Sequence, residues 1–188
     1  MQNIRIALSG KRRSGKSTTT QKLVERASSL GFQPAVISHS SAIKLVAQKG
    51  FSISPTDRGG LQRVGFDWGM LAASKVLGST DIWTNWVLSD TQEAESAGFN
   101  FIVCDDLRFT CQADFLRNEN FLLVRLDTTP ELISSRDQGG KTTGNDSHPS
   151  ETDLDNYSLW DIQLMPNVTI DHIVEVVWLH LQKRGLLQ

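Results

Sequence analysis

The stretch Gly10-Lys-Arg-Arg-Ser-Gly15-Lys16-Ser17 decides the fold of this 188-residue chain. It follows an apolar run at 4–8 that predicts a strand, and it precedes a stretch whose apolar side chains recur at helical spacing. Two glycines let a backbone wrap closely around a phosphate, and successive N–H groups at a helix N-terminus then form an anion cradle. In such a pattern the lysine reaches the β- and γ-phosphates, and the serine hydroxyl is a Mg²⁺ ligand. The stretch therefore predicts a phosphate-binding loop (a P-loop) for a nucleoside triphosphate.

We expect the triphosphate to contact the whole loop and the first turn of the helix that follows. The expected ATP-binding residues are Gly10, Lys11, Arg12, Arg13, Ser14, Gly15, Lys16, Ser17 and Thr18. Lys16 is expected to be catalytic because its charge would bridge the β- and γ-phosphates, and Ser17 is expected to bind the metal ion.

Composition narrows the classes of partner and compartment. The formal charge of −2 and the pI near 6.1 give no general attraction to a polyanion. Long nucleic acid is therefore not an expected partner, although a local basic patch would still allow it. No apolar run has membrane-spanning length. Cys104 and Cys111 lack metal-type spacing and predict a reduced, cytoplasmic protein. The length predicts a single domain, 1–188.

Strand and helix signals alternate along the chain, which predicts a mostly parallel sheet covered by helices on both faces. The segment 138–150 is rich in glycine and small polar residues, and this composition fits a surface loop and a mobile lid equally well. The expected architecture is the three-layer α/β/α fold of P-loop NTPases, with a small mobile lid at about 130–152. Expected strands cover 4–8, 34–37, 101–104, 121–126 and 160–165, and expected helices cover 16–30, 40–50, 54–77, 81–97, 129–136 and 169–183.

Two carboxylates follow the apolar run 101–104, where a buried parallel strand would end at an active-site edge. Phosphoryl transfer requires an oxygen ligand that holds Mg²⁺ opposite the P-loop. Asp105 is the expected metal ligand together with Ser17, and Asp106 is expected to be catalytic. Which of the two carboxylates faces the metal stays open.

Phosphoryl transfer also requires cations that offset the charge developing on the transferred group. Arg108 lies two residues beyond Asp106, so a strand-end Asp-x-Arg would present both charges to one cleft. Arg136, on the expected helix 129–136, is placed to act from the lid. We expect both arginines to be catalytic.

The chain resembles the bacteriophage-type deoxynucleoside monophosphate kinases of the P-loop nucleoside/nucleotide kinase superfamily. The resemblance covers nearly the full length and implies an ATP-dependent, Mg²⁺-requiring phosphotransferase acting on a small nucleotide. Beyond the P-loop it rests on Ala42-Ile-Lys44, Leu61-Gln-Arg63-Val-Gly65, Asp81-Ile-Trp83, Asp106-Leu-Arg108-Phe and Ser147-His-Pro-Ser-Glu151. The expected acceptor-binding residues are Lys44, Arg63, Trp83, Asp105, Asp106 and Arg108.

Two departures from the family pattern leave the substrates open. Pro166-Asn167-Val168 stands where an Asn-Asp-Gly-like turn usually lies near the adenine, so the donor base is unassigned. Ser40-Ser41 stands where Asp-Pro or Gly-Pro is usual, so the acceptor base and sugar are unassigned too. A homodimer is compatible with the sequence, and the cytoplasm would be that of the host if a phage encodes the chain.

Two other functions compete with this interpretation. The acceptor could be a hydroxyl group, on a hydroxymethylated pyrimidine in DNA or on a small metabolite, and Asp105 or Asp106 would then act as a base. The other competing function is a nucleotide-binding switch without a phosphoryl acceptor. Asp57-Arg-Gly-Gly60 matches the Asp-x-x-Gly of GTPases, but it follows no expected strand and no base-reading motif comes after it.

Overall fold

The computed structural model describes residues 3–78, 81–136 and 147–187. Within them, five parallel strands form one sheet in the order β2-β3-β1-β4-β5. The strands are β1 (Ile4–Ser9), β2 (Pro34–Ile37), β3 (Phe101–Leu107), β4 (Leu122–Leu126) and β5 (Ile162–Leu164). The helices are α1 (Lys16–Ser29), α2 (His39–Phe51), α3 (Arg58–Gln62), the π-helical η1 (Arg63–Ala72), α4 (Ala73–Leu77), α5 (Ile82–Ser96), α6 (Thr110–Asn118), α7 (Pro130–Arg136), α8 (Pro149–Thr152) and α9 (Ile170–Lys183). The predicted α/β class with a parallel sheet is confirmed.

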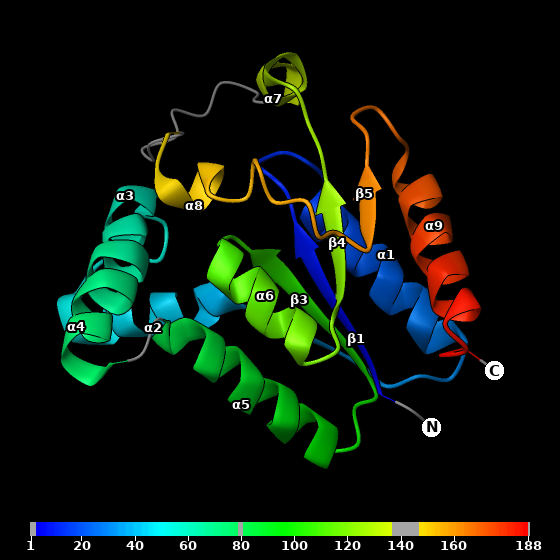
Figure 1. Ribbon diagram of the computed structural model, residues 1–188, viewed down its shortest axis with the longest axis horizontal. Coiled ribbons are helices and arrows are strands. Elements are labelled where there is room, and N and C mark those ends of the chain that lie inside the picture. The colour runs from blue at the N-terminus through cyan, green and yellow to red at the C-terminus, as the bar shows by residue number, and fades with distance from the viewer. Residues whose placement is uncertain (1–2, 79–80, 137–146, 188) are drawn as a thin grey trace.

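Helices cover both faces of the sheet, with α1 and α9 on one face and α5 and α6 on the other (Figure 1). Successive side chains of a strand point to opposite faces, so β3 contributes to two cores. Phe101 and Val103 pack into the core that α1 and α9 cover, whereas Ile102 and Cys104 pack into the core with α5 and α6. None of the described helices combines the length and the apolar composition that crossing a bilayer requires.

The structure differs from the expected elements in the length of β3 and in the presence of α6. The apolar run predicts that the third strand ends at Cys104, but β3 continues through Asp105 and Asp106 to Leu107. Helix α6 is missing from the prediction because its buried side consists of Gln112, Ala113 and Leu116, which give a weak apolar signal. The extension of β3 places both carboxylates within the strand rather than in a turn beyond it.

The expected helix 54–77 is three consecutive helical segments. Asp57 caps α3 by accepting a hydrogen bond from the Gly60 N–H at 3.0 Å. The chain then continues as the π-helix η1, and this segment packs against Trp83 of α5. The indole N–H of Trp83 donates to the Gly65 carbonyl oxygen at 2.7 Å. A Cβ atom at Gly69 would come within 2.3 Å of the indole ring, so the close packing of η1 requires glycine there.

The expected lid at about 130–152 is described only in part. Helix α7 begins it and α8 lies near its end, whereas residues 137–146 fall outside the described residues. Its mobility therefore stays a prediction.

Candidate active site

The P-loop connects β1 to α1, as the sequence predicts. A Cβ atom at Gly10 would lie 2.6 Å from the Leu126 carbonyl oxygen, so this position requires glycine. Gly15 is the N-cap residue of α1 with a φ of 95°, which is a left-handed conformation that glycine adopts without strain. In the structure no side chain caps this end of α1. The loop therefore presents its backbone N–H groups and the positive end of the helix dipole to an anion.

Lys16 lies across the P-loop. Its ammonium group donates to the carbonyl oxygens of Gly10 at 2.6 Å and of Lys11 at 2.9 Å. Burial and the nearby charge of Arg108 lower the pKa of Lys16 to about 7. A phosphate group beside the ammonium would relieve both effects, so this lysine is placed to bind a polyanion.

Two oxygen donors for a divalent cation are available on α1 and β3. The Ser17 hydroxyl is in the first turn of α1, and Asp105 is half-buried on β3. Burial and the neighbouring Asp106 raise the pKa of Asp105, while the charges of Lys16 and Lys44 act in the opposite direction. Hydroxyl and carboxylate oxygens are the hard ligands that Mg²⁺ prefers, so this donor set fits the expected ion.

An ion-pair network that no sequence motif predicts supports the P-loop. Arg125 is buried on β4 and donates to the Ser9 hydroxyl at 3.0 Å and to the Asp155 carboxylate at 3.2 Å. The same carboxylate accepts from Lys11 at 2.7 Å. The sequence does contain an indication of this network, because Arg125 is a charged residue within an otherwise apolar strand.

Asp106 is fully engaged in the fold. Its carboxylate accepts from the Ser38 hydroxyl at 2.8 Å and from the backbone N–H groups of His39 at 2.9 Å and Ser40 at 2.6 Å. Burial opposes ionisation, but these hydrogen bonds and His39 hold the pKa of Asp106 well below its usual range. Asp106 therefore joins β3 to the N-terminus of α2 as a carboxylate that is ionised at neutral pH, and this environment opposes the proton uptake that a general base requires.

A cavity of about 340 Å³, which we call the central cavity, lies between α2, α3, η1, α5, α6 and α8. Arg108 and Glu151 of its lining also line a small hollow with Gly10 and Lys11 of the P-loop. The central cavity brings together four of the six expected acceptor-binding residues: Lys44, Trp83, Asp106 and Arg108. Asp105 is not among the residues that line the central cavity, and Arg63 lines a separate hollow with His148 and Pro149.

Two arginines of the central cavity share one carboxylate. Glu151 of α8 accepts a hydrogen bond from Arg108 at 2.9 Å and forms an ion pair with Arg58 of α3 at 3.0 Å, and its side chain is only 7% exposed. Arg58 occupies a variable position of Asp57-Arg-Gly-Gly60, and Glu151 is the last residue of Ser147-His-Pro-Ser-Glu151, so neither residue has a role that the sequence predicts. We call these three residues the Arg58–Glu151–Arg108 cluster.

Arg136 is the last residue of α7. Its side chain lies outside what the structure describes, so the expected catalytic role stays a prediction. The roles of Arg12 and Arg13 in binding ATP also stay predictions.

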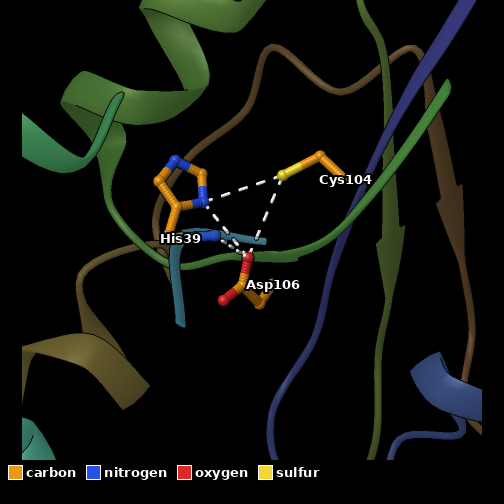
Figure 2. A group of neighbouring side chains, drawn as sticks. All are labelled: His39, Cys104 and Asp106. Atoms are coloured by element: carbon orange, nitrogen blue, oxygen red, sulfur yellow. Dashed lines mark hydrogen bonds and ion pairs between the residues drawn. The ribbon is translucent and has the colours of Figure 1, made fainter. Parts of the chain in front are cut away.

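His39, Cys104 and Asp106 form a buried group at the base of α2 (Figure 2). The His39 Nδ1 atom lies 3.2 Å from the Asp106 Oδ1 atom and 3.7 Å from the Cys104 sulfur. One ligand atom from each residue falls within 4.8 Å of the others, which would allow a metal ion. A metal requires a thiolate, however, and burial raises the pKa of the Cys104 thiol. The Asp106 oxygens also accept hydrogen bonds from α2, so we interpret the group as a hydrogen-bonded network.

Comparisons with known proteins agree with the fold. A scan against models of protein families gave no match, and a search of curated protein sequences gave none either. Shikimate kinase from Aquifex aeolicus vf5 is similar at 21% identity over 98% of this chain and 100% of its own, with a TM-score of 0.55. The APS kinase of Mycobacterium tuberculosis, solved in complex with AMPPNP and APS, has 16% identity over 97% and 99% of the two chains and a TM-score of 0.58.

A sugar kinase from Janibacter sp. HTCC2649 is also similar, at 16% identity over 96% of this chain and 95% of its own, with a TM-score of 0.59. At these identities the likeness establishes the fold alone. The chain has the α/β fold of P-loop kinases, and the P-loop lies at the position that this fold requires.

Proposed function

We propose that this protein transfers the γ-phosphoryl group of ATP to a nucleoside monophosphate and releases the diphosphate. The observation that carries the proposal is the central cavity, which has Lys44, Arg58 and Arg108 in its lining and adjoins the P-loop through Arg108 and Glu151. Three cations in one cavity match an acceptor that is itself a phosphate, because charge-assisted contacts to phosphate oxygens are strong.

The apolar part of the central cavity is consistent with an acceptor that carries a flat nucleotide base. The rings of Phe66 and Phe109 are stacked with their centroids 5.6 Å apart and their planes 9° apart. Both rings line the central cavity, and so does the buried indole of Trp83. Aromatic walls combined with a few polar groups are typical of sites that bind nucleotide-sized molecules.

A hollow beside the P-loop, distinct from the central cavity and from the hollow at Arg63, is consistent with a site for the ATP donor. It is lined by Ser14 of the P-loop, by Leu126 and Leu132, and by Asn167 and Val168 of the turn before α9. This position, next to the P-loop and separate from the central cavity, suits the base of ATP.

The mechanism is positioning and charge stabilisation. The acceptor phosphate is already anionic, so the reaction requires no general base. Lys16 would hold the β- and γ-phosphates, and Arg108 would hold the acceptor phosphate in line with them. Mg²⁺, bound by Ser17 and Asp105, would neutralise charge on the donor phosphates.

One observation favours a hydroxyl acceptor as the second candidate. The pKa of Asp105 is raised by burial and by Asp106, which is the direction that a general base requires. A hydroxyl acceptor would lose a proton during the reaction, whereas a phosphate acceptor would not.

The test measures ATP consumption against a panel of nucleoside monophosphates, with hydroxymethylated DNA and small hydroxyl-bearing metabolites included. For a nucleotide acceptor, Arg108→Lys keeps the charge but loses the two-pronged donor, so it should impair the use of the acceptor more than Asp105→Asn does. For a hydroxyl acceptor, the rank order should reverse and the Asp105→Asn loss should depend on pH.

Arg117→Lys is the matched control, because Arg117 is an exposed arginine of α6 that contacts the Leu159 carbonyl oxygen. ATP consumption that no acceptor increases would refute the proposed function.

A further inference from the structure

His39 is a buried histidine that lines the central cavity and has one nitrogen without a partner. Its side chain is 2% exposed, and Nε2 has no hydrogen-bond partner among the described residues. Figure 2 shows Nε2 on the side of the ring that is turned away from Cys104 and Asp106. A buried polar atom without a partner costs free energy, so such an atom in the wall of a binding cavity points to a ligand.

The orientation of the ring is fixed before a ligand binds. Nδ1 faces the Asp106 carboxylate at 3.2 Å, and the same carboxylate accepts from the His39 backbone N–H. An ionised carboxylate at Nδ1 keeps the proton there. Burial opposes a charge on the ring, but the ionised Asp106 carboxylate favours it, and the pKa of His39 is raised well above its ordinary value. The ring then carries a proton on both nitrogens, so Nε2 is an N–H donor, and the contact between Nδ1 and Asp106 holds it in place.

We propose that His39 selects the acceptor by donating a hydrogen bond from Nε2 to a carbonyl oxygen of the acceptor's base. The inference rests on the proposed function, since it assigns one contact to the nucleoside monophosphate. Lys44, Arg58 and Arg108 provide for the phosphate, so the donor that His39 offers to the same cavity is left for the base. Nε2 is covered in the structure, and the covering side chains therefore move as the base enters.

Two substitutions separate a contact with the acceptor from support of the fold. The variant His39→Asn retains an amide near the position of Nδ1, so it preserves the bond to Asp106 and removes Nε2. The variant His39→Gln places its amide near Nε2 and gives up the bond to Asp106. We expect His39→Asn to lower kcat/KM for the acceptor about tenfold to a hundredfold, the loss typical of a buried hydrogen bond to a charged group. His39→Gln should restore part of that loss, and neither should change the KM for ATP.

Acceptor analogues locate the partner atom. One pair is inosine monophosphate and purine riboside monophosphate, which differ in the 6-oxygen, and a second pair is uridine monophosphate and its analogue lacking the 4-oxygen. Removing the contacted oxygen should cost the wild-type protein about the same factor as His39→Asn. In the His39→Asn variant, removing the same oxygen should cost little more. His172→Asn, on the exposed side of α9, is the matched control.

Three results would overturn the proposal. The first is His39→Asn with wild-type acceptor kinetics and His39→Gln impaired, which is the order expected if His39 only supports α2. The second is an equal loss for every analogue. The third is a stoichiometric transition metal in the purified protein that His39→Asn removes.

If the wild-type protein accepts no nucleoside monophosphate, the proposed function and this inference both fail. If it accepts one and the variants behave as in the first result, only the inference about His39 fails.

Discussion

Lys16 combines a functional position with an unfavourable environment for its charge. Replacing it with Met should reduce phosphoryl transfer by orders of magnitude, because the charge on the β- and γ-phosphates loses its partner. The fold should survive and become more stable below about pH 7. Protonated Lys16 is desolvated in the folded protein, and its lowered pKa means that folding gains stability as the pH rises from about 7 toward the ordinary lysine range. Thermal unfolding at pH 6 and a coupled ATP assay would measure both effects. A variant that keeps near-normal turnover would refute the assignment of the P-loop.

Glu151 offers a second test at the scale of the residue. Its carboxylate holds both Arg58 and Arg108, which line the central cavity, so an acceptor phosphate must share these arginines with it. Glu151→Gln keeps the size and a carbonyl oxygen but removes the negative charge. We expect the acceptor KM to fall about threefold to tenfold, equivalent to roughly 1 kcal/mol. Steady-state kinetics at fixed ATP would measure it. An increase in KM would show instead that the carboxylate is required to orient the two arginines.

Some residues of the site belong to a contiguous sequence motif, whereas others are defined by partners that are distant in the chain. The P-loop is a contiguous motif whose spacing is itself the physical requirement, and in the structure this motif connects β1 to α1. His39, Arg58 and Arg125 have no such motif. Each acquires its role from partners that are distant in the chain, such as Asp106 for His39 at a separation of 67 residues. A single sequence does not show which distant partners meet.

At the scale of the element, the junction between β3 and α2 depends on Asp106. Asp106→Asn keeps the shape but removes the charge that accepts two backbone N–H bonds at the start of α2. We expect a loss of about 1–2 kcal/mol in the free energy of unfolding at neutral pH, as for the loss of a helix cap. The pKa of Asp106 is depressed in the folded protein, so its contribution is complete above the ordinary pKa and declines as the pH falls below about 4. Urea unfolding at pH 7 and pH 3 would measure this. A difference between variant and wild type that does not shrink in acid would contradict it.

The packing of η1 against α5 gives another prediction for an element. Gly69→Ala would place a methyl group within 2.3 Å of the Trp83 ring, so η1 or the indole must shift. We expect a loss of about 1–3 kcal/mol in stability, the usual cost of overpacking. Gly50→Ala in α2 is the control, because its methyl group would meet nothing closer than 3.9 Å and alanine is the better helix former. Thermal unfolding of the two variants should change in opposite directions, and equal behaviour would refute the packing argument.

The starts of α3 and α5 follow from local chemistry, because Asp57 and Asp81 cap them with their side-chain carboxylates. The π-helical turns of η1 have no local signal. They depend on how Gly65 and Gly69 meet an indole from another helix.

For the whole molecule, substrate binding should appear as stability. A non-hydrolysable ATP analogue with Mg²⁺, present at about 100 times its Kd, should raise the free energy of unfolding by roughly 2.7 kcal/mol. A nucleoside monophosphate should add a further increase if it occupies the central cavity. Differential scanning calorimetry with each ligand and with both would measure this, and the Lys16→Met variant should lose most of the response to the ATP analogue. No response to the analogue in the wild-type protein would contradict the proposed donor site.

The order of the strands in the sheet also determines how the chain can fold during its synthesis. Strand β1 lies between β3 and β4, and Ile4 pairs with Phe101, about 100 residues later. At the ribosomal rate of about 5–20 residues per second, the first strand therefore waits roughly 5–20 seconds for its first partner. During that interval an apolar strand next to the P-loop is exposed on the nascent chain. The sheet therefore cannot form around β1 before Phe101 has been synthesised.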